Sequence, residues 1–294
     1  MDSPSPSNLA KVPAIGLLLV AIASVQAGAA LAVGLFRTLG PLGTVSLRVT
    51  LAAAILLLAW RPRFDREVRS SLPLLILFGL SIAGMNWCIY EAIARIPLGI
   101  AVTIEFAGPL AVAVATSRRS RDFVWIGFAV AGIALLTPLT GGRLDLLGVI
   151  LALLAGACWG AYSLLGAKVG RVFPGGAGLA IGIAIAALAL LPFGAWTAGR
   201  ALWNHPSLLG VGLVVALAST VIPFSLEFEA LRRLPARTYG VLVSLDPAAA
   251  AVAGLLILHQ MPTLRTFAAI ACVSVAAAGV TLTAQRDSRQ SAPR

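Results

Sequence analysis

EAIARIPLGIAVTIEFAGPLAVAVA (residues 91–115) and EALRRLPARTYGVLVSLDPAAAAVA (residues 229–253) are two versions of one segment. At a constant offset of 138 residues and without a gap, 9 of the 25 positions are identical. The identical positions include the pairs Glu91/Glu229, Arg95/Arg233, Pro97/Pro235 and Pro109/Pro247. Chance similarity between two alanine-rich hairpins does not readily produce a shared Arg-x-Pro corner, so the alignment favours an internal repeat.

Apolar stretches long enough to cross a bilayer recur along almost the whole chain, which is 59% hydrophobic and 11% charged. We expect these stretches to be helices, because a helix satisfies its backbone hydrogen bonds within the segment. The alternating ten-residue strands of a membrane barrel are absent. The ten predicted spans are 12–34, 43–60, 72–94, 98–116, 123–140, 146–167, 177–198, 207–231, 236–258 and 263–284.

Five spans in each copy would place the second copy upside down relative to the first. The predicted repeats cover 12–140 and 146–284, and polar tails at 1–11 and 285–294 flank them. Inverted repeats are a common plan of secondary transporters, whose substrate site lies near the middle of the membrane. The sequence therefore predicts an all-α polytopic membrane protein built from two inverted five-helix repeats.

The net charge of +11 is a topology signal rather than the mark of a nucleic-acid partner. With a cytoplasmic N-terminus, 16 of the 22 lysines and arginines fall in inside segments, five fall in outside loops, and Arg48 lies within a span. An excess of basic residues in short cytoplasmic loops sets the orientation of a membrane protein. Both termini are therefore predicted in the cytoplasm, and no nucleic acid is expected to bind.

The chain carries no motif of an enzyme, a nucleotide-binding domain or a metal site. Its three cysteines lie inside apolar spans, and its two histidines are too few for a metal site. A glycine-rich phosphate loop, G-x-S-x-G and HExxH are all absent. We therefore expect no cofactor, no metal and no enzymatic activity, and any energy for transport must come from an ion or solute gradient.

Ionisable side chains inside a span are costly, and they usually face a cavity or a partner. Glu105 and Asp246 should approach mid-depth, each within four residues of an intramembrane proline that frees a backbone carbonyl. We predict that both line a cavity and carry charge or a proton. For Glu227, which follows Pro223 by four residues, a functional and a structural role are both open.

The other charged groups within or near the spans have structural interpretations. Glu91 and Glu229 can each pair with the arginine four residues later, as surface pairs on a helix near the headgroups. Arg48 can either snorkel outward or neutralise an acid within the bundle.

Uncharged polar and aromatic residues suggest a site for a small zwitterion. Gln26, Asn86, Trp159 and Tyr162 lie within predicted spans, and we predict that they contact the substrate. For Asn86 the alternative is an interhelical hydrogen bond.

Several stretches resemble EamA-type domains of the drug/metabolite transporter superfamily and, more narrowly, its bacterial threonine/homoserine exporters. They span nearly the whole chain in the right order: ASVQAG (23–28), GMNW (84–87), PLGIAVTIEFAGPLAVAV (97–114), GACWGAY (156–162), PFSLE (223–227) and RLPARTYG (233–240). The resemblance implies efflux of small neutral amino acids coupled to protons. The residues that fall on the family pattern are Gln26, Asn86, Glu105, Trp159, Tyr162 and Glu227.

Two positions depart from that pattern. Asp246-Pro247 stands where such exporters often carry Glu-Pro, which preserves the charge but shortens its reach. His259-Gln260 stands where many EamA-type repeats carry Gly-Glu, so no carboxylate there can take part in coupling.

The resulting prediction is a multi-pass exporter of the bacterial inner membrane that works by alternating access. Its expected partners are an amino-acid substrate, the lipid bilayer and protons, and a homodimer is compatible with the sequence. The alternatives are an exporter of other metabolites or drugs, an importer, and a non-transporting scaffold or lipid-modifying enzyme. A lipid enzyme should show a His/Asp/Lys cluster at one membrane interface, and the sequence has none.

Overall fold

The structure, a computed structural model, describes residues 13–62, 65–115, 123–135, 145–173, 176–234 and 236–290. Within these ranges every regular element is helical and no strand occurs. In chain order the elements are α1 (Ala14–Val33), α2 (Phe36–Trp60), α3 (Arg66–Ser70), α4 (Leu72–Ile93), α5 (Leu98–Glu105), α6 (Ala107–Ala115), α7 (Phe123–Leu135), α8 (Leu146–Val172), α9 (Ala177–Asn204), α10 (Ser207–Ala216), the π-helical turn η3 (Leu217–Val221), α11 (Ile222–Arg233), α12 (Ala236–Val243), α13 (Asp246–Leu258) and α14 (Leu264–Gln290).

Seven helical stretches are long and apolar enough to cross a membrane. They are α1, α2, α4, α8, α9, the run Ser207–Glu227 through α10, η3 and α11, and the run Thr238–Leu258 through α12 and α13. Two shorter apolar helices cover Leu98–Val112 and Leu264–Gly279. Large apolar side chains such as Leu58, Leu188 and Trp196 lie exposed on the surface, as expected of residues that face lipid. The chain is thus an all-helical polytopic membrane protein.

The second predicted span, 43–60, is longer in the structure because α2 begins at Phe36. The helix kinks at Gly40, whose φ of 70° is accessible to glycine, and Pro41 follows the kink. The sequence predicts only the part of α2 after this kink, because that part alone forms one continuous apolar run.

Two of the predicted spans are broken near their middle. The span 98–116 divides at Phe106 into α5 and α6, and the span 236–258 divides at Ser244–Leu245 into α12 and α13. A proline follows each break by a few residues and has no N–H to donate to the preceding turn. Irregular backbone at this depth is tolerated where it is buried in protein or faces a cavity.

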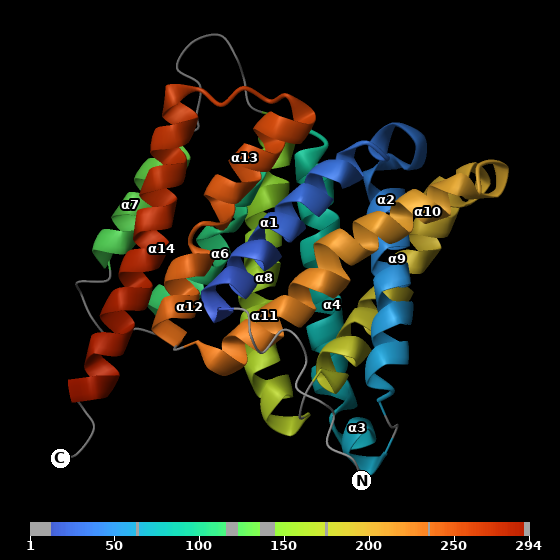
Figure 1. The fold of residues 1–294 in the computed structure, drawn as a ribbon, viewed down its shortest axis with the longest axis horizontal. Coiled ribbons are helices and arrows are strands. Elements are labelled where there is room, and N and C mark those ends of the chain that lie inside the picture. Colours follow the sequence, from blue (N-terminus) through green and yellow to red (C-terminus); the bar gives the residue numbers. More distant parts are fainter. Residues whose placement is uncertain are drawn as a thin grey trace.

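Helices that are far apart in the sequence pack side by side in the fold (Figure 1). α1 lies against α11 and α13, whereas α8 lies against α4, α5 and α6. α2 packs along α9, and the pair α7 and α14 forms one edge of the molecule, at the left of Figure 1.

Glycines permit the closest of these approaches. A Cβ at Gly108 of α6 would lie 1.8 Å from the Gly156 carbonyl oxygen of α8, and a Cβ at Gly182 would lie 2.5 Å from the Phe78 ring. Gly108, Gly156 and Gly182 thus allow neighbouring helices to approach closely. The approach at Gly108 brings α6 tightly against α8, the helix that carries Trp159 and Tyr162, and a Cβ at Gly156 would likewise meet the Glu105 carbonyl oxygen of α5 at 2.5 Å.

Candidate functional site

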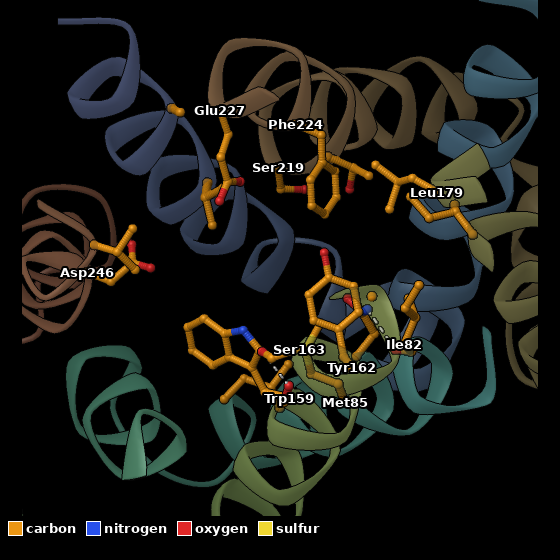
Figure 2. Close-up of a pocket in the computed structure, with 18 of the residues that line it drawn as sticks. Ile82, Met85, Trp159, Tyr162, Ser163, Leu179, Ser219, Phe224, Glu227 and Asp246 are labelled. Carbon is orange, nitrogen blue, oxygen red and sulfur yellow. Dashed lines mark hydrogen bonds between the residues drawn. The ribbon is translucent and has the colours of Figure 1, made fainter. Parts of the chain in front are cut away.

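A cavity of about 700 Å³ lies between helical elements from both halves of the sequence, among them α1, α2, α4, α5, α8, α9, η3, α11, α12 and α13 (Figure 2). All seven predicted site residues line it: Gln26, Asn86, Glu105, Trp159, Tyr162, Glu227 and Asp246. The fold therefore brings together side chains from six helices and both halves of the sequence. Their roles in binding and coupling stay predictions.

The three acids reach the cavity from different helices and in different surroundings. Glu105 is the last residue of α5, immediately before the break, and it is buried with 7% of its surface exposed. Asp246 begins α13, immediately after the second break, and Glu227 lies on α11. In Figure 2, Glu227 and Asp246 project toward the same central space as Trp159 and Tyr162.

Hydrogen bonding distinguishes these carboxylates. Gln26 Nε2 donates to Asp246 Oδ1 at 3.2 Å, and the Tyr239 hydroxyl donates to Glu227 Oε1. Among the described residues no side chain donates a hydrogen bond to Glu105. Glu105 is therefore the least constrained of the three acids, although the charges of Arg48 and Asp246 both act on it.

Arg48 does not snorkel outward, contrary to one of the two expectations from the sequence. It is 7% exposed and lines the cavity. Its guanidinium donates to Asn86 Oδ1, to Thr220 Oγ1 at 3.0 Å and to Ser219 Oγ at 3.4 Å, and it lies 4.9 Å from the centre of the Tyr90 ring. Arg48 stays inside because these neutral acceptors hold it there.

Asn86 makes the interhelical hydrogen bond that was its alternative role. Its Oδ1 accepts from Arg48 of α2, and its Nδ2 donates to the Ile82 carbonyl oxygen of its own helix at 2.8 Å. Both ends of the amide are thus in use while the side chain lines the cavity.

Aromatic rings from α8 form part of the cavity wall. Trp159 meets Phe106 edge to face with 5.3 Å between ring centres, and Tyr162 stacks on Phe78 at 5.3 Å. Each of these two rings of α8 thus packs against an aromatic ring from another part of the fold.

Among the cavity residues that the sequence did not predict as site residues are Arg48, Ser219, Thr220 and Tyr239. The sequence marks Arg48 as a charged residue inside a span but predicts only a structural role for it. Tyr239 lies in the RLPARTYG stretch. Its partner Glu227 lies on the preceding helix, and the spacing of the two residues does not predict that they meet. Ser219 and Thr220 are aimed by the π-helical turn η3, for which the sequence offered no signal.

The outlying acids behave as predicted. Glu91 and Arg95 form an ion pair at 2.6 Å, and Glu229 and Arg233 form the corresponding pair. Neither glutamate lines the cavity. Gln260 has a structural contact, because its Oε1 accepts a hydrogen bond from the backbone N–H of Leu98 at 3.0 Å.

Comparison with known proteins places this architecture in a family. Residues 146–282 match the EamA-like transporter family. The chain is 47% identical over 97% of its length to the threonine/homoserine exporter RhtA of Escherichia coli, and 46% identical over 96% of its length to RhtA of Salmonella typhimurium; 97% of each of those proteins is covered. A crystal structure with 19% sequence identity superposes with a TM-score of 0.59, over 92% of this chain and 99% of the other, and this likeness concerns the fold alone. The chain belongs to the EamA-like transporter family, together with the RhtA proteins.

Proposed function

We propose that this protein exports small neutral amino acids of the threonine and homoserine type across the bacterial inner membrane. The observation that carries the proposal is the central cavity, which combines three acids, an arginine, amides and aromatic walls. Such a cavity matches a small zwitterion with a hydroxylated side chain. The 47% identity to RhtA along nearly the whole chain supports the same substrate class.

In this proposal the protein crosses the membrane ten times, in two inverted repeats that cover residues 12–140 and 146–284. The two helix breaks support this plan, because Phe106 and Ser244 are equivalent at the offset of 138 residues. The packing supports it as well. α1 contacts α11 and α13, and the first helix of the second repeat, α8, contacts the corresponding helices α4, α5 and α6 of the first. α5–α6, α7 and α14 complete the ten.

Energy comes from the exchange of substrate for protons, with Glu105, Asp246 and Glu227 carrying the charge. Glu105 is the primary proton carrier because it is buried and no described side chain donates a hydrogen bond to it. Gln26, Asn86, Trp159 and Tyr162 form the substrate site. Alternating access to this site from the two membrane faces then gives net export.

Both termini lie in the cytoplasm in this scheme. α3 and the C-terminal ends of α8 and α14 occur at one end of the bundle, at the bottom of Figure 1. The basic residues Arg66 and Arg69 of α3 and Lys168 and Arg171 of α8 would mark that end as cytoplasmic. Reporter fusions at Gln285 should read cytoplasmic and fusions at Gly141 external. An external reading at Gln285 would contradict the ten-span arrangement.

Vesicles containing the purified protein and loaded with labelled threonine test the function directly. We expect saturable release that accelerates when a pH gradient is imposed. Lysine and glutamate should be poor substrates, because each brings an extra charge that would be left unpaired in the cavity. Threonine release that is unsaturable, or absent beside robust efflux of an unrelated drug, would instead indicate an exporter of other metabolites or drugs.

A further inference from the structure

We propose that Arg48 binds the α-carboxylate of the transported amino acid and so fixes the direction in which the substrate lies in the cavity. The inference rests on the proposed function and adds a residue to the substrate site. The substrate ammonium then faces the acids contributed by α5, α11 and α13. Arg48 would thereby be a specificity-determining residue rather than only a structural one.

Within the described part of the chain, the charge of Arg48 has no partner of opposite sign in contact. Arg95 and Arg233 each pair with a glutamate four residues earlier. Among the described residues, no carboxylate lies within ion-pair distance of Arg48, and all its hydrogen-bond acceptors are neutral. A buried charge without a counter-charge in contact is costly, and a carboxylate arriving in the cavity would reduce that cost.

The Arg48 guanidinium also has an N–H donor without an acceptor. Arginine carries five N–H donors in a planar fork that suits a carboxylate. The described contacts use both terminal nitrogens of Arg48, while Nε is buried and has no acceptor. A substrate carboxylate would supply the missing acceptor, and an unmet buried donor favours such a ligand.

The surrounding structure also holds Arg48 in place from two other helical elements, α4 and η3. Asn86 of α4 and Ser219 and Thr220 of η3 accept its hydrogen bonds, and Tyr90 of α4 faces its charge. These residues and Arg48 form what we call the arginine cradle. A π-helical turn is rare within an α-helix and often occurs at a functional site, and here it aims two hydroxyls at one guanidinium.

α1 in turn fixes η3. Ser24 Oγ donates to the Ala218 carbonyl oxygen at 2.5 Å. A Cβ at Gly28 would lie 2.7 Å from the Ser219 backbone nitrogen, so only glycine allows α1 to approach this closely. α1, α2 and α4 from the first half of the sequence thus meet η3 from the second half at the cradle. A side chain held across both halves can respond when those halves move.

The cavity is therefore polarised in a way that suits a zwitterion. Its cation is held by α2, α4 and η3, whereas its acids come from α5, α11 and α13. Figure 2 shows Ser219 of the cradle and Asp246 at separate places around the same space. An α-amino acid can place its carboxylate at the cradle and its ammonium near the acids. An amine without the carboxylate would leave the arginine unpaired and add a repelling charge.

Counterflow with two competitors tests the inference. Vesicles containing the full-length protein are preloaded with unlabelled threonine, and labelled threonine enters against unlabelled threonine or threoninol, in which an alcohol replaces the carboxylate. In the wild type we expect threoninol to compete at least about tenfold more weakly than threonine, because a site built to pair a polar group rejects an analogue that lacks it. In Arg48→Gln, unlabelled threonine should compete only as weakly as threoninol does. Competition by threoninol should stay the same or become stronger.

The ratio between the two competitors separates recognition from structural damage. If the role of Arg48 is purely structural, its replacement should weaken competition by threonine and by threoninol equally. The ratio of the two would then be unchanged, and that result would overturn the inference. Equal competition in the wild type would overturn it too, without any variant. If the wild type takes up no threonine at all, the proposed function fails, and the inference falls with it.

Two further variants guard against misfolding of Arg48→Gln. Thr220→Val keeps the shape of the side chain but removes one acceptor of the cradle, and should reduce the preference for threonine over threoninol by a smaller factor. Arg200→Gln removes an exposed arginine outside the cavity and should leave the preference unchanged. An unchanged preference in Thr220→Val, together with an unfolded Arg48→Gln, would count against the cradle as the carboxylate site.

Discussion

The two broken helices of this protein share one backbone design and differ in their chemistry. At the offset of 138 residues, the break at Phe106 corresponds to the break at Ser244, and Pro109 corresponds to Pro247. The acids, however, do not correspond. Glu105 ends the helix before the first break, and Val243 occupies the equivalent place at the second break.

The second acid, Asp246, instead begins the helix after its break, where the first copy has Gly108. Gly108 cannot carry a side chain because α8 passes directly over it, with the Gly156 carbonyl oxygen in the way. The repeat therefore preserves the position of the helix break. The packing of neighbouring helices decides whether a carboxylate can stand before the break or after it.

The largest effect should follow from making the first break resemble the second. Gly108→Asp would place a Cβ 1.8 Å from the Gly156 carbonyl oxygen, so α6 and α8 would have to separate. Overpacking of this kind costs about 1–3 kcal/mol and more where backbone is in the way. We expect a marked loss of folded protein, measured as the monodisperse fraction and melting temperature in detergent. The matched variant Asp246→Gly should stay folded, and instability of both variants would mean that the two positions are packed alike.

Glu105→Gln should have the next largest effect, on transport rather than on folding. Replacing the carboxylate by an amide preserves size but removes the group that takes up a proton. Release of labelled threonine driven by a pH gradient should fall to the level of empty vesicles, with unchanged amounts of protein in the membrane. If gradient-driven release continues in this variant, Glu105 is not required for coupling, and the coupling role belongs to Glu227 or Asp246.

A smaller effect is expected at the second break, where Asp246 is already tied to Gln26 across two helices. We expect Asp246→Asn and Gln26→Leu to weaken threonine transport, and the double variant to be less damaging than the sum of the two. A hydrogen bond to a charged group implies a coupling energy of about 1.5–3 kcal/mol. A double-mutant cycle on transport rates measures it. Strict additivity would show that the contact is not used during transport.

The smallest effect should come from the ion pairs that precede each break. Glu91 and Glu229 pair with Arg95 and Arg233 in the same i, i+4 arrangement and lie outside the cavity lining. Partly exposed pairs of this type contribute about 0.2–1 kcal/mol. Glu91→Gln should therefore retain most transport and shift the melting temperature only slightly. Transport as low as that of Glu105→Gln would erase the distinction between structural and functional acids.

Much of the candidate site could be anticipated from the sequence because a bilayer makes polar residues conspicuous. Gln26, Asn86, Glu105 and Asp246 stood out as polar groups in apolar spans, and all of them reach one cavity. The interhelical role of Asn86 and the outward role of Glu91 were also among the expectations. These inferences succeed because lipid offers no hydrogen bonds, so a polar side chain there must have a partner or a cavity.

The sequence by itself determined the helical class, the repeated corner and the set of polar residues inside the spans. Those features follow from local physics: the length of apolar stretches, the missing N–H of proline and the cost of charge in lipid. Tertiary structure alone decided that Arg48 turns inward, that η3 aims Ser219 and Thr220 at it, and that Tyr239 meets Glu227. These contacts join residues on different helices, or on different turns of irregular backbone, and no periodicity along one segment can specify which of them meet.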